Sequence, residues 1–453
     1  MAEILELMNR LVWGLPALIM ILGVGIYLSI RSGFAQLTFF PKSICLLIKQ
    51  FKKKGSVEGA SAYQALCTAL AATVGTGNIA GVAGAICIGG PGAVFWMWIC
   101  ALLGMVTKFA EATLSVRFRN INRAGEFVGG PMYMIENGLG SKWKWLAKLY
   151  CFLCVFASLG VGNATQINTV IGALNSVITS NGGESSFAVN FLLGIAFASL
   201  MGTLFWGGAS RIGKIAEKLV PLASAVYILL GVVILIVRCN TLPSVIHSIF
   251  IGAFSPKSVT GGVLGSAFIA LRTGASRGVF TNEAGMGTAS IAHGAAAVNH
   301  PVEQGMMGAL EVFLDTIVIC TITALVILSS GISIPYGQDI GITLTSQAFA
   351  SVYGSWVHII MTLAVCCFAV ATILGWGLYG ARCAQYLFGE DFWHKFVFVQ
   401  VITIVVGSVA GTGTVWVLSE IVNGLMVIPN LLVLLLLSPE FINLIKEYRK
   451  NFR

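Results

Sequence analysis

Charged residues are what this sequence has least of. Only 10% of its 453 residues are Asp, Glu, Lys or Arg, while 57% are hydrophobic and the mean hydropathy is +0.89. Soluble domains carry about 25% charged residues, so this composition excludes an ordinary soluble domain and predicts a chain embedded in lipid. The apolar runs are continuous over about 20 residues rather than alternating. They exclude an outer-membrane β-barrel and favour an all-α polytopic membrane protein.

The sequence also lacks the motifs of common enzymes. Its five histidines show no metal-ligand spacing, and it has no His-Glu-x-x-His motif and no complete nucleotide-binding P-loop. The 11 cysteines lie mostly in apolar runs, and the C-x-x-C pair Cys151 and Cys154 has no second pair to complete a zinc site. We therefore predict no enzyme, no ATP-driven pump and no bound cofactor.

Eleven apolar segments are long enough to cross a bilayer as helices. They cover residues 11–30, 63–89, 91–116, 146–175, 187–206, 215–238, 262–292, 305–330, 353–387, 395–411 and 414–438.

The net charge of +9 arises mainly on one side of these segments. Lys and Arg are frequent in residues 31–54, 117–148 and 446–453, and scarce in residues 181–186 and 331–341. By the positive-inside rule, this pattern predicts a plasma-membrane protein with its N-terminus outside and its C-terminus cytoplasmic. An odd number of spans agrees with that orientation. The charge is thus explained without a nucleic-acid partner.

The second segment carries polar residues and glycines at its centre, in the stretch Thr73–Asn78 (TVGTGN). Two glycines two residues apart weaken a helix, so we predict a break there. A broken helix exposes free N–H groups that attract a carboxylate and free carbonyls that attract a cation. The alternative is a face of small residues for close helix packing.

The seventh segment, residues 262–292, has a similar interruption at Arg272–Gly278 (RTGASRG). Without the first segment, an extra N-terminal helix at residues 11–30, ten segments remain. They divide into two groups of five that each begin with an interrupted helix. Five is odd, so the groups face opposite ways, as in transporters whose binding site lies at the midplane. We predict one transmembrane domain, 1–453, made of two inverted repeats, 63–238 and 262–438.

Three motifs resemble one known family. Val74–Asn78 (VGTGN) is similar to the broken first core helix of LeuT-type transporters. Gly89–Gly104 (GGPGAVFWMWICALLG) resembles the sixteen-residue signature of the alanine or glycine:cation symporter family, and Gly278–Ala289 (GVFTNEAGMGTA) is similar to that family too. The resemblance covers essentially the whole chain. It implies a LeuT-type fold and symport of a small neutral amino acid, alanine or glycine, with sodium.

The resemblance also implies roles for individual residues. The amides of Thr76 and Gly77 would hold the substrate carboxylate. The implied substrate-binding set is Thr73, Gly75, Thr76, Gly77, Asn78, Gln166, Phe268, Ile269, Thr273, Gly274 and Trp376. The implied sodium ligands are Thr73 and Asn78 for a first ion, and the carbonyls of Ala71 and Val74 with Thr372 for a second. Oxygen ligands of this kind suit a hard cation.

Within that set, carbonyls of Phe268, Ile269 and Thr273 would accept from the substrate amine. Gln166 is either a binding group or an interhelical hydrogen bond, and Trp376 is either a pocket wall that admits only small side chains or a packing residue.

Charged residues inside the predicted spans leave further alternatives open. Lys108 and Glu111 stand three residues apart, which favours a local ion pair. Arg272 and Arg277 flank the predicted break in the seventh span. Either could bind the substrate carboxylate directly, but we favour a structural or gating pair with a carboxylate elsewhere. Glu311 and Asp315 lie four residues apart on one face of the eighth span and could relay protons, which keeps a proton-coupled permease as the alternative function. A channel is the third hypothesis, although no filter motif is seen.

Overall fold

The computed structural model describes residue 8 and residues 12–52, 60–180, 182–255 and 266–451. Within these ranges the protein is almost entirely helical, and one small sheet pairs β1 (Asn120–Ile121) with β2 (Phe127–Val128) in antiparallel order. The helices up to the middle of the chain are α2 (Leu15–Ser32), α3 (Ala35–Thr38), α4 (Phe40–Lys52), α5 (Ala62–Thr73), η1 (Thr76–Asn78), α6 (Ala80–Gly89), α7 (Gly92–Arg117), α8 (Pro131–Tyr133), η2 (Met134–Leu139), η3 (Ser141–Trp143), α9 (Lys144–Ala157), η4 (Ser158–Ala164), α10 (Thr165–Ser180), α11 (Phe187–Trp206) and α12 (Gly208–Val237).

The later helices are η5 (Cys239–Thr241), α13 (Leu242–Phe254), α14 (Ala267–Asn282), α15 (Ala289–His293), α16 (Pro301–Val312), η7 (Phe313–Cys320), α17 (Thr321–Ser329), α18 (Ile342–Tyr353), α19 (Val357–Phe388), η8 (Glu390–Phe392), α20 (Trp393–Val409), α21 (Thr412–Leu436) and α22 (Ser438–Asn451). Three of the elements, η2, η4 and η7, are π-helical. Such π-helical turns are rare in proteins, and many of those that occur lie at functional sites.

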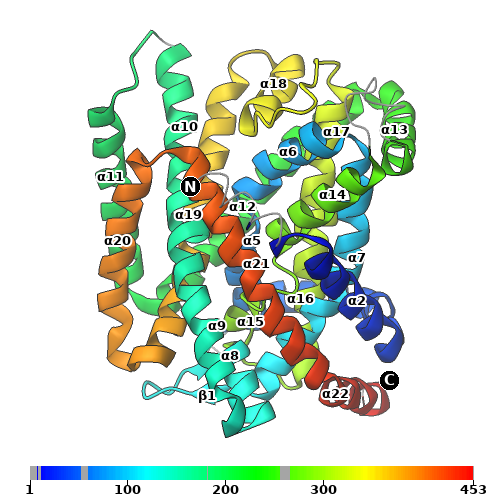
Figure 1. The fold of residues 1–453 in the computed structure, drawn as a ribbon, viewed down its shortest axis with the longest axis vertical. Helices are drawn as coiled ribbons and strands as arrows, with labels where there is room; N and C mark the ends of the chain where they lie inside the picture. The colour runs from blue at the N-terminus through cyan, green and yellow to red at the C-terminus, as the bar shows by residue number, and fades with distance from the viewer. Residues whose placement is uncertain (1–7, 9–11, 53–59, 181, 256–265, 452–453) are drawn as a thin grey trace.

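The helices form two packed groups (Figure 1). On one side α7 packs against α14 and α16, and at the opposite edge α11 packs against α20. Between these edges α19 contacts α5, α9 and α10. The large side chains buried in this middle region include Trp376, Tyr379 and Tyr150. The broken helix α5–α6 therefore sits in the interior of the bundle, where its backbone is shielded from lipid.

Among the described residues, eight helices are long and apolar enough to cross a membrane, and the bent pair α5 and η1–α6 makes nine. The other two predicted spans correspond to α2 and to α14 with α15, which are shorter. The start of the first predicted span, residue 11, and residues 262–265 of the seventh lie outside the described residues. The count of eleven spans and the inverted repeat stay predictions.

The break in the second span is confirmed, at the position that the sequence predicts. α5 ends at Thr73, Val74 and Gly75 are extended, and the chain turns by 59° into η1 and α6. Gly75 permits the close approach of this turn to α19, because a Cβ there would stand 2.5 Å from Thr372 Oγ1. A larger residue at position 75 would push α5 and α19 apart.

The predicted break at Arg272–Gly278 is wrong. This stretch lies within the continuous helix α14, where Gly274 packs against the Ala93 carbonyl and Trp96 of α7. Its glycines therefore serve close helix packing. The break comes later, between α14 and α15, where Glu283 has φ 54° and Gly285 and Gly287 also have positive φ. A glutamate in this left-handed region is uncommon, so surrounding contacts must hold it there.

Candidate functional site

Asn78 holds the first break in its observed shape. Its Oδ1 accepts a hydrogen bond from the Gly75 N–H at 2.8 Å, and its Nδ2 donates to Asp315 Oδ1 at 2.6 Å. Because the Gly75 N–H is used in this way, it no longer donates to the carbonyl of Ala71, its partner in a regular helix. The turn thus leaves a backbone oxygen at the end of α5 without its helical donor.

The second half of the broken helix begins with Thr76, Gly77 and Asn78, all buried. Thr76 Oγ1 donates to Gln166 Oε1 at 3.0 Å, and Gln166 Nε2 donates to the Val161 carbonyl at 3.2 Å. Gln166 therefore makes an interhelical hydrogen bond beside the break, which was one of its two predicted roles. A part in substrate binding remains a prediction.

Thr372 on α19 faces the first break, and its role as a cation ligand stays a prediction. Its Oγ1 faces Gly75 and is buried without a hydrogen-bond partner among the described residues. Buried hydroxyl groups are nearly always hydrogen-bonded, so an unpartnered one is an exception with a cause. A buried hydroxyl oxygen of this kind is a suitable ligand for a small hard cation. The Thr73 hydroxyl donates its hydrogen to the Ala69 carbonyl at 3.3 Å. Donating this hydrogen leaves the lone pairs of Thr73 Oγ1 able to bind a cation.

Trp376 lies one helical turn further along α19 and is 1% exposed. It packs against Gly162 in η4, where a Cβ would collide with the Trp376 side chain, and its ring meets Tyr379 edge-on at 5.9 Å. The indole is therefore fixed between α19 and the π-helical turn. Its place in the bundle fits a rigid wall, and its contact with substrate stays a prediction.

Four residues of the predicted substrate site lie elsewhere. Phe268 and Ile269 are at the start of α14 and are 43% and 38% exposed, while Thr273 and Gly274 pack α14 against its neighbours α6 and α7. The carbonyls of these residues belong to a regular helix and are not freed by a break. The prediction placed them at the site because it placed the break about ten residues too early.

The true second break is capped by a carboxylate from α7 that the sequence reasoning assigned to another role. Glu111 Oε1 accepts from the N–H groups of Gly285 at 2.9 Å and Gly287 at 3.2 Å, and from Asn430 Nδ2 at 2.7 Å. Glu283 Oε2 accepts from Thr288 Oγ1 across the same turn. These contacts hold the irregular backbone between α14 and α15.

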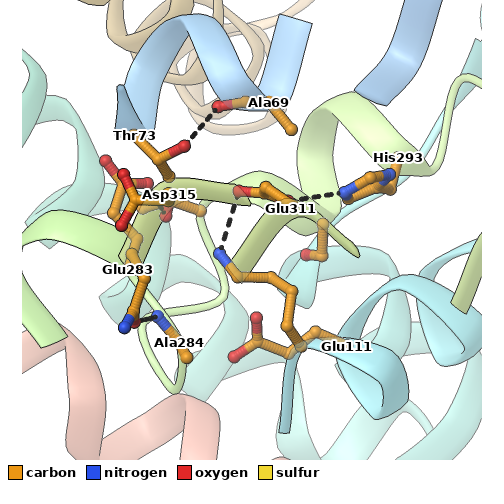
Figure 2. A network of polar contacts seen from close by, with 12 residues as sticks. Ala69, Thr73, Glu111, Glu283, Ala284, His293, Glu311 and Asp315 are labelled. Carbon is orange, nitrogen blue, oxygen red and sulfur yellow. Dashed lines mark hydrogen bonds and ion pairs between the residues drawn. The ribbon is translucent and has the colours of Figure 1, made fainter. Parts of the chain in front are cut away.

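A buried charge cluster lies beside this break (Figure 2). Lys108 Nζ is 3.4 Å from Glu311 Oε1, and Glu311 Oε2 is 2.8 Å from His293 Nε2, with all three side chains fully buried. The predicted local ion pair of Lys108 with Glu111 is therefore wrong, since the observed ion pair joins α7 to α16. Gln304 Nε2 lies 2.6 Å from His293 Nδ1 and fixes the imidazole ring.

Glu311 and Asp315 were predicted as a proton relay, but they have different partners. Glu311 belongs to the cluster with Lys108, whereas Asp315 reaches Asn78 in the first break. Asp315 lies in the π-helical turn η7, which the sequence gives no means of locating. The signal that could have drawn attention to it is its acidic side chain at the centre of an apolar segment.

A vestibule lies on each side of the first break. One, of about 570 Å³, is lined by Gly81, Asn168 and Arg277, and the other, of about 480 Å³, by Gln64, Glu126 and Arg382. Charged residues that line each vestibule form ion pairs with one another. Arg277 bonds Glu420 at 3.0 Å and lies 3.6 Å from Asp339, and Arg382 lies 2.8 Å from Glu126. Arg277 is therefore paired with carboxylates from other segments, which is one of the roles predicted from the sequence for Arg272 and Arg277.

The sequence profile of the sodium:alanine symporter family matches residues 1–453. The chain belongs to the sodium:alanine symporter family. It is 39% identical over 456 residues to "Sodium/alanine symporter AgcS" of Methanococcus maripaludis, covering 99% of this chain and 98% of that protein. It is 36% identical over 460 residues to "Probable sodium/glutamine symporter GlnT" of Bacillus subtilis, covering 100% of this chain and 92% of that protein.

The fold is similar to the crystal structure of MhsT in complex with L-phenylalanine. The TM-score is 0.59 at 16% sequence identity, and the match covers 84% of this chain and 90% of that one. At this identity the likeness shows the fold alone, which is of the LeuT type. Family membership and the amino-acid carriers among its relatives make this chain a multi-pass membrane protein and a secondary amino-acid transporter.

Proposed function

We propose that this sodium:alanine symporter family member carries alanine or glycine into the cell together with sodium. The observation that carries the proposal is the broken helix α5–α6. It brings a buried hydroxyl group without a partner, Thr372 Oγ1, to the backbone at Gly75. Such a break suits a cation on one side and a carboxylate on the other. The name of the relative AgcS, a sodium/alanine symporter, agrees with this pairing.

In the proposed cycle the substrate carboxylate binds the N–H groups of Thr76 and Gly77. These groups begin the second half of the helix, where the helix dipole also favours negative charge. Trp376 forms the wall opposite, and its close packing against Gly162 holds the side chain in place. A side chain larger than a methyl group therefore clashes, which selects alanine and glycine by size.

Two sets of oxygen atoms hold sodium as a co-substrate. The first is Thr73 and Asn78, and the second is the carbonyls of Ala71 and Val74 with the hydroxyl of Thr372. None of these groups carries a net charge, so the ion supplies the positive charge that the substrate carboxylate needs nearby. This explains why the two solutes would travel together.

The proposed orientation places the Arg277 vestibule outside and the Arg382 vestibule in the cytoplasm. It follows from the Lys and Arg distribution of the loops. Arg277 with Glu420 and Asp339 then forms the outer gate, and Arg382 with Glu126 the inner gate. Burial alone would raise the pKa of Glu126, but the hydrogen bond and charge of Arg382 outweigh it and hold this pKa below its ordinary value. The inner pair therefore persists in mildly acidic cytoplasm.

Breaking the inner pair is expected to favour the inward-open form. Glu126→Gln and Arg382→Gln should each lower sodium-driven alanine accumulation about threefold to tenfold, which corresponds to about 1 kcal/mol for a partly exposed pair. Alanine exchange without a gradient should persist. Accumulation and exchange are measured in proteoliposomes for both variants and for the double variant. If the double variant loses the sum of the two single losses in free energy, the residues do not act as a pair.

A proton-coupled permease is the second candidate function, and the buried carboxylates Glu311 and Asp315 are the observation that favours it. Radiolabelled alanine uptake into proteoliposomes separates the two. We expect uptake under an inward sodium gradient, with no uptake under an inward potassium gradient. Uptake under an inward proton gradient without sodium would overturn sodium coupling. Flux that does not saturate with alanine would point to a channel instead of a carrier.

A further inference from the structure

An apolar groove lies along α5, between that helix, α4, α12 and the π-helical turn η7. Its volume of about 400 Å³ is within the range of ligand pockets. Among the described residues that line it, only Tyr63, Cys67 and Ser224 have an oxygen or sulfur atom in the side chain. An ion or an amino acid would lose its hydration there without gaining polar partners. The groove is therefore separate from the path of the transported solutes, and its chemistry suits a hydrocarbon chain.

The groove has the depth of one leaflet of a bilayer. On α5 it extends from Tyr63, in the first turn, to Val74, which directly follows the last turn at the first break. The eleven residue steps between them rise about 16 Å in an α-helix. The hydrocarbon core of a bilayer is about 30 Å thick, so the groove reaches from the membrane surface to about the midplane. In the proposed orientation this is the cytoplasmic half of the membrane.

The walls of the groove belong to the lipid-facing surface of the bundle. Leu222 and Leu229 of α12 are 67% and 65% exposed, whereas Ser224, on the groove, is half-buried. On α4, Ile48 lines the groove and is 49% exposed. Exposed apolar side chains at membrane depth meet lipid. An acyl chain of a neighbouring phospholipid can therefore enter the groove from the side.

Positive charge flanks the cytoplasmic end of the groove. Lys42 and Lys49 are exposed on α4. Lys218 is exposed on α12, two residues before Val220 in the groove wall. Glu217 offsets one of these three charges. Basic residues at the cytoplasmic membrane surface attract anionic head groups, so the charge at this end complements a phospholipid with a negatively charged head group.

We propose that this groove binds one acyl chain of an anionic phospholipid from the cytoplasmic leaflet, with its phosphate near Lys49 and Lys218. The bound chain lies against Val74 at the first break, and against Leu314 and Ile319 of η7. It therefore supports the broken helix and η7 together, and it stabilises the observed shape of the break through dispersion contacts. The inference goes beyond the proposed transport and takes from it only the orientation, which decides the leaflet.

The first measurement is the effect of lipid on the thermal unfolding temperature. The full-length protein, purified in detergent, is heated with added phosphatidylglycerol or phosphatidylcholine, which share their acyl chains and differ in head-group charge. We expect phosphatidylglycerol to raise the unfolding temperature, and to reach half of its effect at about a tenfold lower concentration than phosphatidylcholine. Mass spectrometry of the purified protein should detect retained phosphatidylglycerol. Equal half-effect concentrations of the two lipids would overturn the assignment of an anionic lipid.

Ser224→Phe tests the groove itself by filling it with an aromatic ring. This variant should retain less phospholipid than the wild type, and its unfolding temperature should no longer respond to phosphatidylglycerol. Leu229→Phe is the matched control, because it places the same ring on the lipid-facing side of the same helix, where Leu229 is 65% exposed. If folded Ser224→Phe responds to phosphatidylglycerol as strongly as Leu229→Phe does, the lipid does not occupy this groove.

The head-group contact is tested by combining Lys49→Gln with Lys218→Gln. This double variant should lose the preference for phosphatidylglycerol and keep the response to phosphatidylcholine. Lys142→Gln with Lys148→Gln is the matched control, since it removes two exposed lysines from η3 and α9, which do not line the groove. A preference that survives in the first double variant refutes the proposed head-group site.

The lysine substitutions lie on the surface, so this comparison holds even if Ser224→Phe fails to fold. All of these measurements are made without sodium and without alanine. A negative result therefore overturns the lipid site and leaves the proposed symport intact, while a failure of sodium-driven uptake leaves the lipid site intact.

Discussion

Replacing Asn78 with alanine is expected to abolish the stimulation of alanine binding by sodium. The substitution removes the amide that reaches both the Gly75 N–H and Asp315. The only other side-chain oxygen of η1 belongs to Thr76, whose hydroxyl is bonded to Gln166, so sodium affinity should fall by about a hundredfold. The measurement is alanine binding by the purified variant with and without sodium.

The protein should still fold after this change. Asn78→Ala leaves one buried N–H group and one carboxylate with fewer partners, which costs about 1–3 kcal/mol for each unpaired group. Asn423→Ala provides a matched control, since Asn423 is a buried amide on α21. This control should retain sodium stimulation. If Asn78→Ala also retains it, Asn78 does not belong to the cation site.

Removing the cap of the second break is expected to cause the largest loss of stability. In Glu111→Ala, the N–H groups of Gly285 and Gly287 and the amide of Asn430 lose their common acceptor. Three buried donors without partners cost together about 3 kcal/mol or more. We expect the thermal unfolding temperature to fall by several degrees, on the order of 1–2 °C per kcal/mol lost for a chain of this length. Thermal unfolding monitored by fluorescence gives the measurement.

The conservative replacement decides whether the cap or the charge matters. Glu111→Gln keeps a side-chain oxygen that can accept from the same donors, and it should recover most of the stability that Glu111→Ala loses. Glu440→Ala is the control for removing a carboxylate, because Glu440 is a partly exposed partner of Arg117. An unfolding temperature of Glu111→Ala equal to that of Glu440→Ala would show that the cap is not stabilising.

The first break could be predicted from the sequence because its signal is local. Thr73–Asn78 concentrates glycines and polar groups within six residues of an apolar segment, and the structure turns there by 59°. The broken helix, the long apolar spans and the family all follow from information that neighbouring residues carry.

The second break was misplaced because glycine has two meanings in a membrane helix. Gly274 permits close packing against α7, while Gly285 and Gly287 permit positive φ. Composition alone does not separate these uses, since the difference depends on what lies across the helix. The better signal was the sequence Asn282–Gly287 (NEAGMG), in which polar residues and spaced glycines occur together.

The partners of the buried charges were predicted incorrectly for a related reason. Lys108 and Glu111 are close in sequence, yet Lys108 pairs with Glu311 and Glu111 caps Gly285 and Gly287. Helical spacing tells which residues share a face of one helix. It does not tell which neighbouring helix that face meets, and here the partners come from α14–α15 and α16.

The two gates bear on the direction of transport. Each ion pair is partly exposed, with Arg277 at 22% and Arg382 at 11% side-chain exposure. Water replaces such a pair at little net cost, about 0–1 kcal/mol. Each proposed gate therefore shifts the balance between the outward-open and inward-open forms by no more than about tenfold. If the proposed symport holds, gates this weak do not prevent reverse transport, so a cell that loses its ion gradient would release the transported amino acid through the same protein.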